Sequence, residues 1–185
     1  MTTRPELVGD FGMVASTHWL ASAAGMSVLE RGGNAADAAA ATAFVLQIVE
    51  PHLNGPGGEV PILVSVDGAP EVEVICGQGV APQAATTVHF AELGLDIVPG
   101  TGLLPAVVPG AFGAWMLLVE RHGSWRLRDI LEPAIALAEN GHPLLANVVT
   151  TINSVAELFR RHWSTSAATW LPRDQVPQAG ERFRR

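Results

Sequence analysis

The sequence has no lysine and no tyrosine, and Cys76 is its single cysteine among 185 residues. Without lysine the chain cannot form a Schiff base or use an amine side chain as a nucleophile. One cysteine cannot form an internal disulfide, which suits a reducing compartment. All eleven basic residues are arginine, and the net charge of −7 argues against nucleic-acid binding, because phosphate contacts require a basic face.

Long apolar runs are missing as well. The longest, residues 38–49, is broken by Thr42 and Gln47 and is too short to span a membrane. Residues 1–10 contain no apolar run of the signal-peptide type. We therefore expect a cytoplasmic protein without a membrane partner.

Charged residues make up 16% of the chain, against about a quarter in ordinary globular domains, and apolar residues make up 48%. Richness in alanine is one explanation. The other is that a partner chain covers part of the surface. The length is sufficient for one domain with a sizeable core, so we expect residues 1–185 to form a single domain.

Two helices are predicted near the start of the chain. The first spans residues 18–31 and ends at a pair of glycines. Asn34 is the expected N-cap of the second, residues 35–49, which Pro51 ends. This second segment is apolar nearly all round, which predicts a helix buried on most of its circumference.

A β-hairpin is predicted next. Residues 60–66 and 71–75 flank an Asp-Gly pair at 67–68, a strong signal for a tight turn. In the second strand two glutamates alternate with two valines, which places Val72 and Val74 on the expected buried face.

Further helices are predicted over residues 108–122, 126–140 and 144–163. Residues 171–185 are polar and contain proline, and we expect no closing element there. Helices with one hairpin give an α+β fold class.

The glycine-rich loop at residues 54–58 lies between a helix and a strand. The dinucleotide-binding motif has the opposite order, strand before helix, so we interpret the loop as a tight corner. The six histidines show no metal-ligand spacing, and we expect neither metal nor cofactor. Cys76 is either a thiol nucleophile or a small buried apolar residue, and a strand end favours the second.

Six motifs then occur in a specific order along nearly the whole chain. They lie at residues 12–16, 32–38, 52–58, 81–82, 108–110 and 131–141. Together they resemble the N-terminal part of the large subunit of the γ-glutamyltransferase family, whose members are self-cleaving N-terminal-nucleophile hydrolases.

The resemblance implies an αββα sandwich built by two subunits, of which this chain holds an incomplete part. It also implies autocatalytic maturation and acyl transfer or hydrolysis through a threonyl ester. The family's nucleophilic threonine begins the second subunit, beyond Arg185, so we expect no catalytic residue in this chain and no activity from it alone. Expected partners are a small-molecule acyl-amide substrate, the missing small subunit or C-terminal half, and further copies in a homo-oligomer.

Residues 16–19 and 86–90 both look superficially like the family's Thr-Thr-His-Phe/Tyr nucleophile segment. The first belongs to the opening motif, and the second has an extra valine and follows the 81–82 motif. We therefore reject both as the nucleophile.

Gln78 marks a departure from the family pattern. Members that cleave γ-glutamyl groups carry an arginine in Phe-Arg-Glu-x-Ala-Pro that clamps the α-carboxylate, and this position is Gln78 here. Glutamine cannot form the bidentate ion pair of a guanidinium. We expect Gln78 to contact substrate, and the chain to resemble the amidohydrolase and acylase members more than the glutathione-cleaving ones.

Two other readings stay open. A truncated homologue without catalysis would act as a binding or scaffold protein. A free-standing thiol enzyme would depend on Cys76.

Overall fold

The computed structural model describes residues 5–184 and divides into two compact units. The helical unit takes residues 1–53 and 122–185, and the hairpin unit takes residues 54–121. Arg185, the last residue of the expected large-subunit fragment, lies outside the described residues. The single-domain expectation for residues 1–185 stays a prediction.

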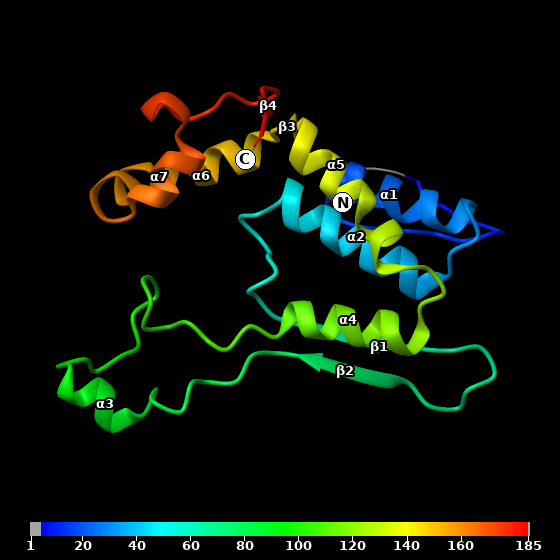
Figure 1. The fold of residues 1–185 in the computed structure, drawn as a ribbon, viewed down its shortest axis with the longest axis horizontal. Coiled ribbons are helices and arrows are strands. Elements are labelled where there is room, and N and C mark those ends of the chain that lie inside the picture. Colours follow the sequence, from blue (N-terminus) through cyan, green and yellow to red (C-terminus); the bar gives the residue numbers. More distant parts are fainter. Residues whose placement is uncertain (1–4, 185) are drawn as a thin grey trace. The chain divides into compact units, whose positions relative to one another are not determined.

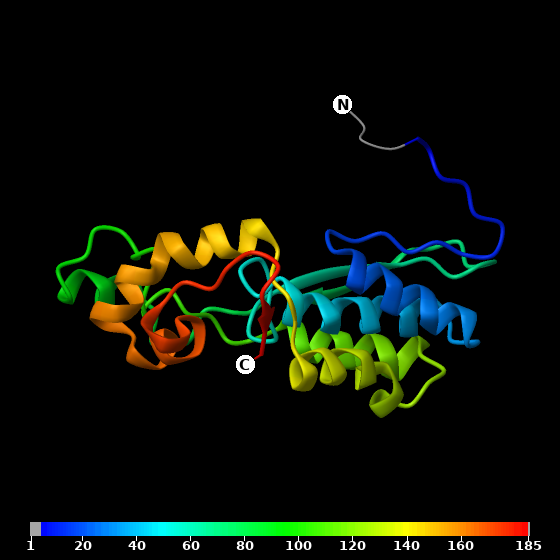
Figure 2. The same cartoon turned by 90° about the horizontal axis from the view of Figure 1, so that it is seen from above.

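Helices α1 (Trp19–Glu30) and α2 (Ala35–Val49) lie side by side in the helical unit, as Figures 1 and 2 show. Both were predicted. The Asn34 side chain accepts hydrogen bonds from the N–H groups of Ala36 and Asp37, and the Asp37 carboxylate accepts from the N–H of Asn34. This reciprocal capping box fixes the start of α2.

Helix α2 is the buried centre of this unit. It packs between α1 and helix α5 (Leu127–Asn140), and 11 of its 15 residues are buried. The predicted burial of residues 35–49 is confirmed. Small alanine side chains make this arrangement feasible, because they let two helices approach the same helix closely.

The end of the chain forms a second cluster. Strand β3 (His142–Pro143) pairs antiparallel with β4 (Arg182–Phe183), and between them lie helix α6 (Ala146–His162), helix α7 (Ser164–Trp170) and a short 3₁₀ turn, η1 (Pro172–Asp174). The expectation that residues 171–185 lack a closing element is wrong. Leu171 and Phe183 are buried against α6. The sequence did not reveal this, because two apolar residues twelve positions apart in a polar segment form no helical or strand periodicity.

The hairpin unit consists of strands β1 (Val60–Val64) and β2 (Glu73–Gly77) with helix α4 (Ala111–His122) alongside them (Figure 1). A short helix, α3 (Thr87–Glu92), was not predicted. The strands pair antiparallel with Ile62 opposite Ile75, and these two isoleucines form the buried face.

The predicted buried face of β2 is wrong. Val72 and Val74 are 55% and 61% exposed, whereas Ile75 is 4% exposed. The alternating pattern placed Glu73 on the solvent-facing side of the strand. Glu73 is the first residue of β2, however, and it forms an ion pair with Arg121 near the end of α4. A charged residue can therefore share the covered face with an isoleucine.

Candidate functional site

Gln78 is the first residue after β2, and its side chain is exposed. Its Oε1 lies 3.9 Å from the Sγ of Cys76, two residues earlier on the same side of the chain. Cys76 is also exposed, so the interpretation of this cysteine as a buried apolar residue is wrong. Cys76 and Gln78 thus continue the open face of the hairpin to which Val74 belongs.

The backbone around Gln78 is held by a close approach of two segments. Val108 N–H donates to the carbonyl of Val80 at 3.0 Å. A Cβ atom at Gly79 would overlap the Val108 carbonyl oxygen, and one at Gly110 would overlap the Gly77 carbonyl oxygen. Only glycine permits this contact, and it fixes the backbone on both sides of Gln78.

The glycine-rich loop at residues 54–58 meets the same segment. Gly58 N–H donates to the Gly55 carbonyl at 3.0 Å, which closes a tight turn in the loop that precedes β1. The Gly58 carbonyl in turn accepts from the N–H groups of Gly110 and Ala111, at 3.3 and 3.0 Å. The start of α4 therefore joins this turn to the end of β2, and the contacts of the loop are those of a structural turn.

Asp37 centres a buried network in the helical unit. Its carboxylate accepts from the Ser124 hydroxyl at 2.7 Å and from the N–H groups of Asn34, Ser124 and Trp125. Burial by itself raises the pKa of Asp37, but the hydroxyl and the three N–H donors favour the charged form and hold its pKa below the ordinary value. All the donors come from the protein, so the network is structural.

A second buried group joins the start of α1 to the end of α2. His18 Nδ1 accepts the N–H of Leu20 at 3.1 Å and so caps α1. The Thr17 hydroxyl donates to the carboxylate of Glu50, the residue that ends α2. Burial lowers the pKa of His18, and the nearby negative charge of Glu50 opposes that shift only in part.

The hydroxyls of the two rejected threonine segments both have structural partners. Thr17 binds Glu50, as above, and the Thr86 hydroxyl oxygen accepts from the N–H of His89 at 3.1 Å to cap α3.

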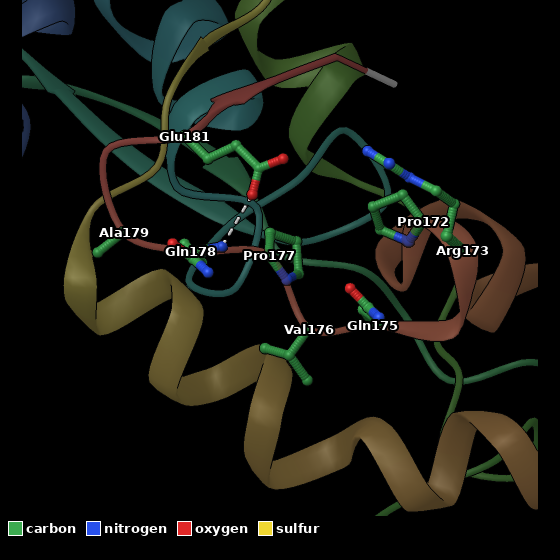
Figure 3. A pocket seen from close by; sticks show the side chains of 8 residues that line it. All are labelled: Pro172, Arg173, Gln175, Val176, Pro177, Gln178, Ala179 and Glu181. Carbon is green, nitrogen blue, oxygen red and sulfur yellow. Dashed lines mark hydrogen bonds between the residues drawn. The ribbon is translucent and has the colours of Figure 1, made fainter.

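The described residues also form a surface hollow of about 400 Å³ near the end of the chain (Figure 3). Figure 3 shows Glu181 accepting a hydrogen bond from the N–H of Gln178, at 3.0 Å, on its rim. Gln78 does not line this hollow. Within residues 5–184, no group of three His, Cys, Asp or Glu side chains is placed to hold a metal ion.

No helix in the described part of the chain is both long enough and apolar enough to cross a membrane.

Comparison with known proteins identifies the relatives of this chain. The family model of gamma-glutamyltranspeptidase matches residues 21–185. The glutathione hydrolase-like YwrD proenzyme of Bacillus subtilis is 35% identical over 179 residues, covering 96% of this chain and 34% of that protein. The acylase ACY 1 proenzyme of Pseudomonas sp. is 37% identical over 188 residues, covering 95% of this chain and 33% of that protein.

Two solved structures also have a backbone similar to that of this chain. LmbA2991HD is 59% identical with a TM-score of 0.96, covering 100% of this chain and 32% of that one. The gamma-glutamyltranspeptidase of Helicobacter pylori is 30% identical with a TM-score of 0.90, covering 98% of this chain and 52% of that one. The α+β fold expected from the sequence is therefore confirmed as that of the N-terminal-nucleophile hydrolases.

This chain spans about a third of the length of the curated relatives that it matches. Those relatives are proenzymes, and the aligned third contains the capping box, the glycine-rich corner and Gln78. On the match of residues 21–185 and the similarity to these proteins, the chain belongs to the gamma-glutamyltranspeptidase family.

Proposed function

We propose that this chain is the N-terminal part of the large subunit of a self-cleaving enzyme that hydrolyses or transfers an acyl group. In the proposed reaction a threonine hydroxyl outside this chain attacks the amide carbonyl of the substrate, and the amine leaves as a threonyl ester forms. Water or an acceptor amine then attacks the ester and frees the threonine. The observation that carries the proposal is the family match of residues 21–185 over a third of the relatives' length.

Gln78 is the proposed contact to the acyl group. Its neighbours Gly77 and Gly79 are fixed by the approach of residues 107–110, so the backbone presents this side chain from a constant position. A neutral amide can donate to and accept from an uncharged acyl group, but it does not neutralise a free α-carboxylate. We therefore assign to the enzyme an acyl-amide substrate without the charged α-carboxylate of a γ-glutamyl group.

The missing part of the enzyme is the proposed partner. On the hairpin, Leu63 and Val74 are 71% and 61% exposed, and the adjoining Val72 is 55% exposed. A sheet face of this composition is usually covered, because each apolar side chain is favourably removed from water. The αββα sandwich of the family supplies the cover from the other subunit.

The test exchanges Gln78 for the arginine of the γ-glutamyl enzymes in the complete, matured protein. Gln78→Arg is expected to raise kcat/KM for a γ-glutamyl anilide relative to an uncharged acyl anilide by about tenfold to a hundredfold, from one charge-assisted pair. Cys76→Ser is the matched control, because it changes the neighbouring side chain without adding charge. An unchanged ratio in Gln78→Arg would remove Gln78 from the acyl site.

Activity of the separate chain provides a second test. We expect no turnover of any acyl-amide by residues 1–185 alone, and turnover when the remaining part with its N-terminal threonine is present. Turnover by the chain alone, abolished by Cys76→Ser, would favour the thiol enzyme. A complete protein that binds acyl-amides but never turns them over would favour the scaffold reading. The cytoplasmic location and the homo-oligomer stay predictions.

A further inference from the structure

The Thr17, His18 and Glu50 side chains form a buried connection between the start of α1 and the end of α2, which we call the α1–α2 latch. His18 and Glu50 are each 2% exposed. His18 is the N-cap residue of α1, and Glu50 is the C-cap residue of α2. Neither residue has a place in the proposed acyl-transfer chemistry, so their burial requires another explanation.

The capping bond fixes the protonation state of His18. Because Nδ1 accepts the N–H of Leu20, it carries a lone pair, and the ring proton of the neutral imidazole is on Nε2. Nε2 is buried and has no hydrogen-bond partner among the described residues. A protonated ring would have N–H groups at both positions, so it could not accept from Leu20.

One charged group is known to act on His18. Glu50, at the end of α2, acts on His18 from the helix packed against α1. The single charged residue within α1 is Glu30 at its far end, and the single charged residue within α2 is Asp37 in its first turn. Glu50 is thus the charge that a protonated His18 would face.

We propose that the α1–α2 latch is a proton-sensitive switch, in which protonation of His18 releases the start of α1 from the end of α2. The incoming proton occupies the Nδ1 lone pair, so the bond from Leu20 N–H is lost and α1 loses its cap. The resulting imidazolium is charged in a site with 2% exposure, and it gains hydration by moving outward. Thr17 moves with it, and its bond to Glu50 breaks.

The α1–α2 latch lies close to the point where the chain passes from the helical unit to the hairpin unit. Three residues after Glu50 the chain leaves the helical unit, because the hairpin unit begins at residue 54. Loosening Glu50 therefore loosens the end of α2 at the point where the chain passes between the units. Gln78 belongs to the hairpin unit. Protonation of His18 would therefore affect the chain segment that leads from α2 to the unit of Gln78.

The direction with pH follows from the pKa of His18. Burial holds it below the ordinary value of 6.5, with the Glu50 charge opposing. Folding therefore favours the neutral ring. The stabilisation is fully present above the unfolded value and is lost as the pH falls through the lower, folded value.

The experiment follows the intact protein by NMR of ¹³C-labelled histidine and by hydrogen exchange corrected for its intrinsic pH dependence. As the pH is lowered from about 7.5 through the His18 transition, we expect the amides at the start of α1 and the end of α2 to lose protection about tenfold, the size of a lost cap. The amides of α6 keep theirs. The His18 resonance should titrate in step with the loss.

Three variants make the result specific. His18→Asn keeps a side-chain acceptor at the N-cap but cannot titrate, so protection should be independent of pH. Glu50→Gln removes the negative charge and should move the His18 midpoint to lower pH. Thr17→Val should leave the response at α1 and abolish it at the end of α2.

Three outcomes would overturn the proposal. One is an unchanged pH response in His18→Asn. Another is a parallel loss of protection in α6, which would mean general acid unfolding. The third is a His18 titration that leaves the exchange of α1 and α2 unaffected.

Discussion

The side-chain oxygen of Ser124 lies 2.7 Å from the Oδ2 of Asp37, although 87 residues separate them in the sequence. The N–H of Ser124 donates to the same carboxylate, and so does the N–H of Trp125. These bonds attach the segment before α5 to the first turn of α2. One carboxylate thereby connects two distant parts of the helical unit and completes its own capping box.

Replacing Asp37 is expected to destabilise the protein substantially. Asp37→Asn keeps the shape but removes the charge, and an amide nitrogen in place of one oxygen opposes the N–H donors. We expect the free energy of unfolding to fall by about 2–3 kcal/mol, the value of hydrogen bonds to a charged group. Denaturant unfolding measures it. Asp67→Asn, in the exposed hairpin turn, is the control and should stay within about 0.5 kcal/mol of wild type.

The contribution of Asp37 should depend on pH in a defined direction. Its folded-state pKa lies below the ordinary value of 3.8, so the stabilisation is present above that value and is lost as the pH falls through the folded one. The difference in unfolding free energy between wild type and Asp37→Asn should shrink as the solution is acidified below about pH 4. A difference that grows with acidification would contradict this assignment.

The close approach at Gly79 predicts a position-specific effect. Gly79→Ala places a Cβ where the Val108 carbonyl oxygen lies, so the two segments must separate. We expect the free energy of unfolding to fall by about 1–3 kcal/mol, as at other overpacked sites, and the activity of the complete enzyme to be reduced. Thermal unfolding and kcat/KM are the measurements.

Gly100→Ala is the matched control for Gly79→Ala, because a Cβ at Gly100 meets no atom within 4 Å. It should leave both the unfolding temperature and kcat/KM near their wild-type values. Equal effects of the two substitutions would show that the contact with Val108 is not what constrains the loop.

The two faces of β1 test whether a partner covers the hairpin. Ile62 is 8% exposed and its neighbour Leu63 is 71% exposed in this structure. In the intact protein we expect Ile62→Asn and Leu63→Asn each to lower the free energy of unfolding by about 2–4 kcal/mol. Leu63 is included because the proposed second subunit buries it as well. Denaturant unfolding of the matured protein gives both numbers. A neutral Leu63→Asn would mean that this face stays in water.

Much of the local structure could be predicted from short-range patterns. The Asn34 cap, the helix of residues 35–49 and the turn at residues 67–68 each depend on neighbours within a few positions. The face of β2 could not be predicted in this way. Both Val74 and Ile75 are apolar. The face that Ile75 shares with Glu73 and Gly77 meets α4, which begins more than thirty residues later.

The candidate site shows the same division. The position of Gln78 came from an ordered set of motifs, and its role as a substrate contact stays a prediction. The contact between Gly79 and Val108 fixes the backbone beside Gln78. It could not be predicted, because no local pattern in either segment indicates that the two segments meet. Burial of Cys76 was wrongly expected for the same reason.

The sequence by itself determined the elements whose signals are local: capped helices, the hairpin turn and an ordered motif set that places the chain in its family. Tertiary structure alone decided which sheet face is covered, that β4 closes on β3, and that Asp37 binds Ser124. Burial is a property of two surfaces meeting, whereas a turn or a cap is fixed by a few adjacent residues. The latch of Thr17, His18 and Glu50 likewise exists only where two helix ends meet.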